Sequence, residues 1–330
     1  MESLLNEGLA SVDISGVFYN PYMKLSRDIS VEVIRRIDDE LEILDGFSAS
    51  GIRGIRYSLE SKNVKRVDFL DFNQSAIDKI RKNININGID GNIFKTKFED
   101  FQDFNNYNFI EIDPFGSPSK YIPIVISRMR RDVFYLSVTA TDTAVLCGKH
   151  WQACIRNYIA RPIRDRTCHE TGLRILIAYI AKIAFIYDYN ITPLMSFYYR
   201  HQMKTIIQLR KDIRSIHDSL GKIDFIHLDD DLNKGIGIGA RNAGPLWIDK
   251  YYSERYLDIP IPLVKQISQE MNIPFHYDLH ELAEFYKIPK IPKLDYIIRE
   301  LGGSRTHFNP KGIKWDRNIG ELVEFIRSQL

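Results

Sequence analysis

The residues best suited to chemistry lie in the stretch NFIEIDPFGSP, residues 108–118. A mostly apolar run leads into Asp113, and Pro114, Phe115 and Gly116 follow directly. A strand that ends there carries a carboxylate, a carbonyl whose direction Pro114 fixes, an aromatic ring and a tight turn. Because a carboxylate only accepts hydrogen bonds and a ring offers a stacking face, the combination suits a flat base with an exocyclic amine. The alternative is a plain strand followed by an Asp-Pro turn without a ligand.

A Gly-rich turn and an acid after the next strand indicate a nucleoside-type cofactor. The segment LEILDGFSASGIRGIRYSLES, residues 41–61, predicts a strand, a Gly-rich turn and a helix, but contains neither GxGxxG nor a phosphate-binding GK[ST]. The following strand, RVDFLDFN, ends at Asp71, where a carboxylate fits ribose hydroxyls or simply caps the next helix. Glu99 and Asp100 follow a third strand, either as acceptors for an adenine amine or as a solvated acidic turn.

Near the N-terminus, the pattern predicts a helix that Ser26 caps and that buries Ile29, Val33 and Ile37. Arg27 falls in its first turn, where a cation opposes the helix dipole. It is either a solvated surface residue or a contact for a ligand carboxylate. Phe18 precedes this helix and is either a packing residue or a second stacking ring.

Residues 149–174 form a basic segment. Its cations are Lys149, Arg156, Arg161, Arg164, Arg166 and Arg174, against the acids Asp165 and Glu170. An Arg-rich excess of one sign near a predicted active edge indicates phosphate contacts. The alternative is a solvated face in which the arginines pair with the two acids.

The elements that must position these residues alternate between strand and helix, which predicts a parallel, doubly wound sheet. Residues 191–211 add two strands joined by a short turn, an ending typical of class I methyltransferases rather than dehydrogenases. Past residue 219 the chain becomes Gly- and Asp-rich, and short helices follow at 264–271, 280–285, 294–301 and 319–330. With the polar loop GGSRTHFNPKGIKWD they predict either a small winged-helix-like RNA-binding unit or an irregular appendage.

Composition narrows the class of protein. Of the 330 residues 44% are apolar and 27% charged, and the net charge is +2, so partners must be inferred from the distribution of charge. The three cysteines form no CxxC pair, which argues against a zinc ribbon or a disulfide framework and fits a reducing compartment. We find neither a signal-peptide pattern nor an apolar run long enough for a membrane span, so we expect a cytoplasmic protein.

Taken in order, seven motifs closely resemble those of the tRNA (guanine-N2)-dimethyltransferases, which methylate guanine 26 in archaeal and eukaryotic tRNA. They are FYNPYMKLSRD, GFSASGIRGIRY, FIEIDPFGSP, LSVTATDTAVLCG, CHETGLRILIAYIA, GPLW and SRTHFNPKGIK, and the form is archaeal-type. The resemblance implies S-adenosylmethionine as cofactor, tRNA as partner, and neither a metal nor an obligate protein partner. It implies a class I (Rossmann-like) methyltransferase domain at 1–219 and a smaller α+β tRNA-binding domain at 220–330.

The resemblance also implies roles for individual residues. Asp113 with Pro114 would hold the guanine amine between the rings of Phe18 and Phe115. The cofactor would contact Arg27 through its carboxylate, Arg53, Asp71 through its ribose, and Asp100 and Phe101 through its adenine, although the family often has a small residue at position 101. The residues implied in RNA binding are Arg156, Arg161, Arg164, Arg166, Arg305 and Lys311.

Three other functions remain open on the sequence. One is methylation of another guanine or adenine amine in RNA or DNA, with the same fold and cofactor. A second is a nicotinamide enzyme, against which the missing GxGxxG and the paired final strands count. A third is an RNA-binding protein without catalytic activity, against which the intact Asp113–Gly116 motif counts.

Overall fold

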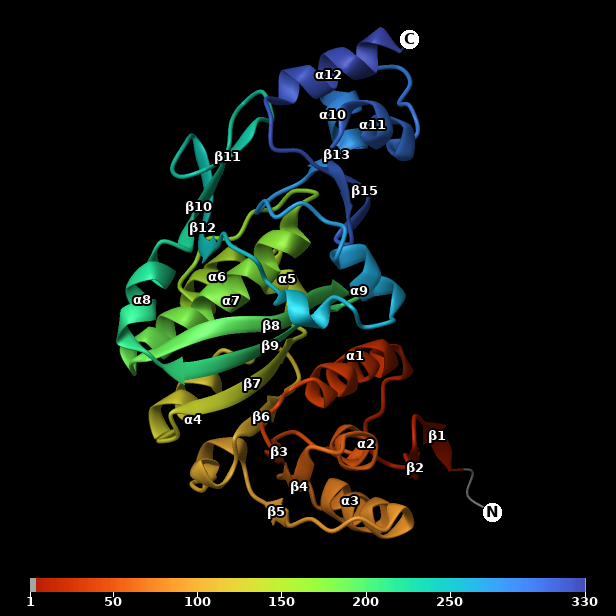
Figure 1. The fold of residues 1–330 in the computed structure, drawn as a ribbon, viewed down its shortest axis with the longest axis vertical. Helices are drawn as coiled ribbons and strands as arrows, with labels where there is room; N and C mark the ends of the chain where they lie inside the picture. Colours follow the sequence, from red (N-terminus) through yellow and green to blue (C-terminus); the bar gives the residue numbers. More distant parts are fainter. Residues whose placement is uncertain (1–3, 330) are drawn as a thin grey trace. The chain divides into compact units, whose positions relative to one another are not determined.

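A computed structural model describes residues 4–329 of the chain, and strands and helices alternate through its first part (Figure 1). The strands of this part are β1 (Leu5–Glu7), β2 (Ala10–Val12), β3 (Leu41–Asp45), β4 (Val64–Asp71), β5 (Ile93–Lys95), β6 (Phe109–Ile112), β7 (Val133–Ala140), β8 (Tyr189–Tyr199) and β9 (Gln202–Lys211). The helices are α1 (Lys24–Arg35), α2 (Ile52–Glu60), α3 (Gln74–Asn87), α4 (Ile122–Arg128), α5 (Thr143–Leu146), α6 (Trp151–Tyr158) and α7 (Cys168–Ile186).

Within the described residues, seven strands form one sheet in the order β5-β4-β3-β6-β7-β9-β8. The strands from β5 to β7 run parallel. β9 runs opposite to β7, because Lys211 bonds to Asp132 at one end while Lys204 bonds to Thr139 at the other. A two-residue connection makes β8 and β9 an antiparallel hairpin. The predicted fold class is confirmed.

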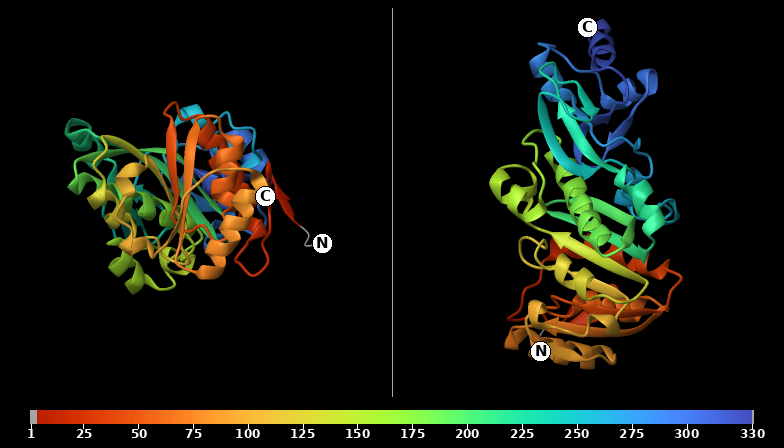
Figure 2. Two further views of the ribbon diagram at one scale, coloured as in Figure 1. Left: turned by 90° about the horizontal axis from the view of Figure 1, so that it is seen from below. Right: turned by 90° about the vertical axis from the view of Figure 1, so that its left-hand side faces the viewer.

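The helices cover both faces of this sheet: α1, α2 and α3 lie on one face and α4 on the other (Figure 2). α3 begins at Gln74 because Asn73 caps it by accepting a hydrogen bond from the Ser75 amide at 2.9 Å, and it ends at Asn87 before Gly88, whose φ is +61°. Ile77 and Ile80 of this helix are buried.

The predicted start of α1 is wrong. Ser26 is buried inside the helix and forms no cap, because α1 already begins at Lys24. A 3-10 turn over Pro21–Met23 precedes it, and Asn20 caps that turn by accepting from the Tyr22 amide at 3.0 Å. Pro21 is well suited to the start of such a turn because its φ is already fixed. Arg27 is therefore the fourth residue of the helix, three positions deeper than a cap at Ser26 would place it.

The remaining elements form two small sheets with short helices. They are α8 (Ile213–Leu220), β10 (Ile223–Leu228), β11 (Lys234–Ile236), β12 (Arg241–Trp247), α9 (Pro262–Ile267), β13 (Tyr277–Asp278), α10 (Leu279–Phe285), α11 (Leu294–Leu301), β14 (Ser304–Thr306), β15 (Asn309–Lys314) and α12 (Ile319–Ser328). The described sheets have the orders β11-β10-β12 and β13-β15-β14, and neighbouring strands in them are antiparallel. The four predicted helices correspond to α9 to α12, but the predicted polar loop is the hairpin of β14 and β15.

By its internal contacts the described chain divides into two compact units. One comprises residues 4–141, 183–195 and 204–213, and the other comprises 142–182, 196–203 and 214–329. The boundaries between the two units fall within α7, β8 and β9. They differ from the predicted domain limits of 1–219 and 220–330, because that prediction assigned one continuous segment of the chain to each domain. The Gly-rich turn and the Asp113 turn belong to the first unit, and the basic segment belongs to the second.

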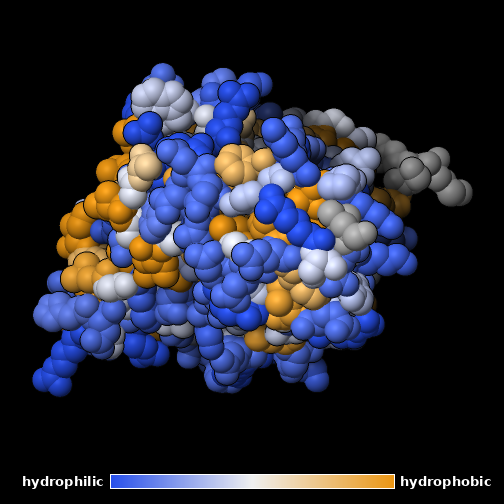
Figure 3. All heavy atoms as spheres, turned by 90° about the horizontal axis from the view of Figure 1, so that it is seen from above, coloured by the Kyte–Doolittle hydropathy of each residue, from blue (hydrophilic) through white to orange (hydrophobic). Residues whose placement is uncertain are grey.

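The surface in Figure 3 mixes hydrophilic and hydrophobic residues. Scattered exposed apolar side chains are normal on a protein surface. No helix within residues 4–329 combines the length and the apolar character needed to cross a bilayer.

Candidate active site

The turn after β6 is held in a defined shape. Gly116 has φ +82°, a conformation that side-chain-bearing residues rarely adopt. Its amide donates to Thr141 Oγ1 at 2.8 Å, and the Thr141 amide donates to the Gly116 carbonyl at 3.0 Å. Because Thr141 follows β7, the neighbouring strand fixes the turn that carries Asp113.

Asp113 is paired with Arg53. The Arg53 Nη2 donates to Asp113 Oδ2 at 2.5 Å, and the two side chains are 7% and 15% exposed. Within the described residues Arg53 Nη1 is buried without a partner, and Asp113 Oδ1 accepts no hydrogen bond. The pair therefore leaves one donor and one acceptor for other groups.

The two aromatic rings assigned to the base lie together in the first unit. Phe18 and Phe115 are 51% and 79% exposed, and their ring centroids are 4.7 Å apart with an interplanar angle of 82°. This edge-to-face contact leaves no space for a base between them, so the predicted sandwich is not formed in this conformation. A stacked base would require the rings to separate and to become parallel.

The Gly-rich turn and Asp71 meet at the carboxyl ends of β3 and β4. Asp71 Oδ2 accepts from the Ala49 amide at 3.0 Å, and its Oδ1 accepts from the Asn73 amide at 2.9 Å. Asn73, not Asp71, caps α3. At Gly46 a Cβ would lie 2.7 Å from the Glu111 carbonyl, so a larger residue cannot occupy this turn. Asp71 therefore orders the turn, and a ribose-binding role for it stays a prediction.

Arg27 is neither a solvated cation nor free. It is 4% exposed, and its Nε and Nη2 each donate to Glu7 at 2.6 Å. Burial alone would raise the pKa of Glu7, but Arg27 and Arg56 outweigh it and lower the pKa to about 2. A carboxylate of the protein thus occupies the place that the resemblance gives to a ligand carboxylate.

The adenine assignments separate into two cases. Asp100 ends a 3-10 turn and is exposed. Phe101 is 4% exposed and its ring packs against Phe94, Phe104 and Tyr107. This buried ring offers no exposed face for stacking, and a contact of Phe101 with the adenine, at a position that departs from the family pattern, stays a prediction.

A buried charge network below Asp113 was missed in the sequence. Glu111 is fully buried and forms an ion pair with the equally buried Lys204 of β9. The Tyr57 hydroxyl donates to Glu111 Oε2 at 2.9 Å. Burial alone would raise the pKa of Glu111, but Arg53 and Lys204 outweigh it and hold the pKa below its ordinary value. The sequence signal that could have indicated this network is Glu111 itself, an acid within the otherwise apolar strand β6.

A further exposed ring was also missed. Phe72 follows Asp71 directly and is 68% exposed. An aromatic residue next to the acid at the end of the second strand could have been noted, because such a ring offers a stacking face beside the ribose position.

In the second unit, the basic segment exposes Arg156, Arg161, Arg164 and Arg166. Within the described residues neither Arg161 nor Arg164 forms an ion pair, because Asp165 pairs with Lys234 at 3.4 Å and Glu170 pairs with Arg174 at 3.0 Å. The alternative in which the arginines pair with the two acids thus holds for Arg174 with Glu170, but not for Arg161 or Arg164. A depression of about 380 Å³ is lined by Gly148, Lys149, Trp151, Gln152, Arg161, Pro162 and Arg164.

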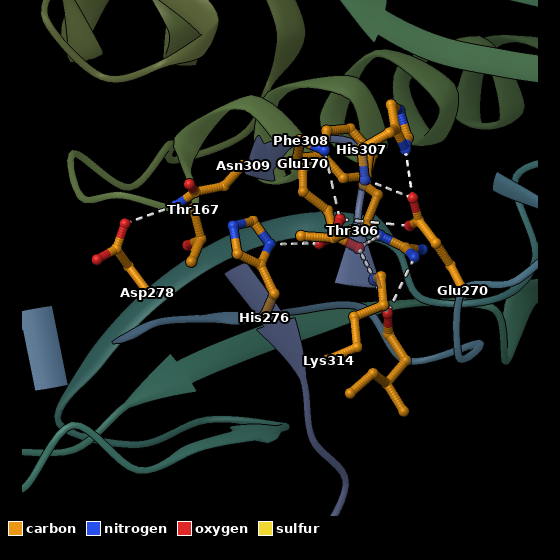
Figure 4. A network of polar contacts seen from close by, with 12 residues as sticks. Thr167, Glu170, Glu270, His276, Asp278, Thr306, His307, Phe308, Asn309 and Lys314 are labelled. Carbon is orange, nitrogen blue, oxygen red and sulfur yellow. Dashed lines mark hydrogen bonds and ion pairs between the residues drawn. The ribbon is translucent and has the colours of Figure 1, made fainter. Parts of the chain in front are cut away.

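The C-terminal basic residues behave differently from one another. Arg305 pairs with Asp295 at 2.7 Å and Lys311 is exposed. His307 bonds to Glu270 at 2.7 Å, and Lys314 bonds to Glu170 at 2.6 Å (Figure 4). The side chains of these last two residues are fully buried, so the expected polar loop is in part a core of paired charges.

Two cysteines that are distant in sequence approach each other in the second unit. Potential ligand atoms of Cys147, Cys168 and His169 lie within 4.8 Å of one another. A search for CxxC spacing does not detect such a group, because it is assembled by α7 and the segment after β7.

The sheet order, the Gly-rich turn after the first strand of the large sheet and the acid after its second define a class I, Rossmann-like methyltransferase. The chain belongs to the N2,N2-dimethylguanosine tRNA methyltransferase family, whose model matches residues 6–258. The predicted family is confirmed.

Individual relatives match over nearly the whole chain. The tRNA (guanine(26)-N(2))-dimethyltransferase of Thermococcus kodakarensis is 34% identical, covering 98% of both chains. The Pyrococcus horikoshii protein of that name is 33% identical, covering 96% of this chain and 94% of its own. The solved structure of Trm1 from P. horikoshii in complex with S-adenosyl-L-methionine has a TM-score of 0.88 and 31% identity, over 98% of this chain and 99% of that chain.

Proposed function

We propose that the protein transfers methyl groups from S-adenosylmethionine to N2 of guanine 26 in tRNA, giving N2-methyl- and then N2,N2-dimethylguanosine. The observation that carries the proposal is the Asp113 carboxylate. Arg53 holds it through one oxygen, and the other oxygen accepts from no donor among the described residues. Asp113 directly follows β6, and the exposed Phe115 lies two residues further on. Membership of the family supports the choice of guanine N2 in tRNA.

Residues around the Gly-rich turn fit the cofactor. Asp71 has the position for ribose hydroxyls, and Arg53 Nη1 is a buried donor without a partner among the described residues. Arg27 would bind the methionine carboxylate by exchanging its contact with Glu7, while Asp100 would accept from the adenine amine. S-adenosylmethionine supplies an electrophilic methyl group on a sulfonium.

The reaction then depends on positioning. The lone pair of guanine N2 is delocalised into the ring, so the amine is a poor nucleophile. Asp113 would accept an N2–H and orient the amine, and a well-aligned pair of reactants can gain ~7–11 kcal/mol from orientation alone. As the N–C bond forms the N–H becomes acidic, and its proton can pass to Asp113 Oδ1 and then to solvent. Pro114 would hold the preceding carbonyl in a fixed direction.

A guanine reaches this carboxylate only after it leaves the tRNA stack. Extrusion costs ~a few kcal/mol, and stacking on Phe18 and Phe115 would offset it once the rings have separated. The pocket must also admit the monomethylated amine if a second methyl group is to follow.

The exposed arginines support a tRNA-binding role. Arg156, Arg161, Arg164 and Arg166 would contact phosphates, because Arg161 and Arg164 are unpaired within the described residues and line a depression. Residues 220–330 would add further contacts through Arg305 and Lys311. Their order from α9 to β15, helix-strand-helix-helix-strand-strand, resembles a winged helix. A free tRNA substrate implies action in the cytoplasm without an obligate protein partner.

Mass spectrometry of nucleosides tests the proposal. Unmodified tRNA is incubated with the protein and S-adenosylmethionine, alongside tRNA in which guanine 26 is replaced by adenosine. We expect N2-methyl- and N2,N2-dimethylguanosine from the first tRNA only. Methylation at another guanine, at adenine or of DNA would replace guanine 26 as the target, and no methylation at all would favour RNA binding without catalysis.

A further inference from the structure

Three side chains beneath Asp113 form one row across the large sheet. Asp45 of β3 stands opposite Glu111 of β6, and Glu111 stands opposite Ser137 of β7. Lys204 of β9 reaches this row, because its Nζ pairs with Glu111 and also donates to Thr139 Oγ1 at 3.0 Å. Glu111 lies two residues before Asp113, so the two carboxylates share a face of the sheet.

α2 covers this row with Arg53 and Tyr57. Arg53 Nε lies 3.7 Å from Glu111 Oε1, while Nη2 of the same guanidinium holds Asp113. Arg53 is therefore shared between a carboxylate that is fully buried and one that faces the proposed substrate. Lys204 also neutralises Glu111, because its Nζ contacts the same oxygen, Oε1.

A buried ion pair contributes little to stability by itself, because removing two charges from water costs about as much as their attraction returns. Its retention directly beneath a site therefore calls for another explanation. Without Glu111, Asp113 would be the sole counter-ion of Arg53 and its free oxygen would be drawn towards the guanidinium. Without Lys204, Glu111 would compete more strongly for Arg53.

We propose that the buried pair Glu111–Lys204 positions Arg53, and thereby sets how strongly its guanidinium interacts with Glu111 and with Asp113. The pair touches neither guanine nor cofactor, and it acts by keeping Asp113 Oδ1 directed outward as an acceptor. This role rests on the methyl transfer proposed above.

The groups that face the pair are Asp45, Arg53, Tyr57 and Asp113. Burial raises the pKa of Asp45 to about 7, and the charge of Glu111 acts in the same direction. Removing Glu111 deletes a nearby anion and should lower the pKa of Asp45, whereas removing Lys204 deletes a nearby cation and should raise it. The two single variants should thus move the acid limb of the rate profile in opposite directions, which lost packing does not do.

The test measures single-turnover methylation of tRNA against pH for Glu111→Gln, Lys204→Met and the charge-matched double variant Glu111→Gln/Lys204→Met. In the double variant we expect the rate to fall about 100-fold, because Asp113 is displaced, with the tRNA affinity unchanged. The single variants should show the opposite shifts of the acid limb. A double variant with wild-type rate and profile would overturn the proposal. The double variant leaves neither partner of the pair buried without its counter-ion. It therefore tests the proposal even if a single variant does not fold.

Two tyrosines provide a matched comparison. Tyr57→Phe removes a hydroxyl that donates to Glu111, and Tyr107→Phe removes one that donates to the buried Asp68 at 2.7 Å. We expect a loss of rate of about fivefold for the first only, since one hydrogen bond is worth ~1 kcal/mol. Equal rates for both variants would overturn the proposal. Absence of methylation by the unchanged protein would instead contradict the proposed function.

Discussion

At the scale of single residues, Asp113 makes the most direct prediction. Asp113→Ala should reduce methyl transfer to tRNA by a factor of at least about 100, because the amine loses its only proposed acceptor. Binding of S-adenosylmethionine should survive, since Arg53 still has Glu111 at 3.7 Å as a counter-ion. Calorimetry would measure the cofactor affinity beside the rate. A loss of cofactor binding as large as the loss of rate would contradict this division of roles.

A second prediction concerns Arg27 and Glu7, which form a buried ion pair and can therefore be varied separately. If Arg27 binds the methionine carboxylate, Arg27→Ala should weaken cofactor binding by ~1.5–3 kcal/mol through loss of a charge-assisted contact. Glu7→Gln keeps the shape of the partner and removes its charge, so it should not weaken binding. An unchanged dissociation constant for Arg27→Ala would make this arginine part of the fold only.

At the scale of elements, the segment after α6 presents Arg161 and Arg164, which form no ion pair within the described residues. Replacing Arg161 and Arg164 by alanine should lower tRNA affinity and flatten its salt dependence by roughly one log unit of slope per lost phosphate contact. Cofactor binding should not change. Arg305→Ala is the matched control, because the existing pair with Asp295 should make its effect smaller. A double variant with the wild-type salt slope would assign these two arginines to another role.

Elements whose signals are local could be predicted from the sequence. Asn73 and Gly88 bound α3, and Leu294–Leu301 form a helix as expected, because caps and helical periodicity act over a few residues. β14 and β15 were missed because their hairpin buries Lys314, a residue type that a sequence pattern places on the surface. The ion pair with Glu170 makes this burial possible, and its partner is 144 residues away.

The site divides in the same way. The Asp113 turn and the Gly-rich turn were predicted because each carries its function within about ten residues. Lys204, Glu111 and Arg53 meet only because β9, β6 and α2 pack together, and no spacing in the chain indicates it. The contact of Arg27 with Glu7 likewise depends on where the β1–β2 hairpin lies.

At the scale of the whole molecule, the buried carboxylates predict how stability depends on pH. Burial would raise the pKa of Glu170, but Lys314 and Arg174 outweigh it and hold the pKa well below its ordinary value. Glu7 behaves similarly, with a pKa near 2. A carboxylate of this kind stabilises the fold at pH values above its pKa in the unfolded chain. Its contribution to the free energy of unfolding is lost as the pH falls towards its lower pKa in the folded protein. Asp45 acts in the opposite sense because its pKa is raised.

We therefore expect the melting temperature to rise as the pH falls from 7 to about 5, because the folded state takes up a proton at Asp45. It should then fall below about 4.5, where the unfolded chain takes up protons at Glu7 and Glu170. Scanning calorimetry over this range measures it. A melting temperature that stayed constant down to about pH 3 would show that these pairs contribute no net stability.

The contact between Phe18 and Phe115 bears on how many methyl groups one encounter adds. For a second transfer the spent cofactor must be exchanged while the monomethylated base either stays or returns. Because the rings pack on each other when no base is present, every departure of the base is followed by closure, and re-entry must again break that contact. The ratio of singly to doubly methylated product is then a kinetic partition between the residence time of the base and the exchange time of the cofactor. A high concentration of S-adenosylmethionine shortens the second time and should favour the doubly methylated product.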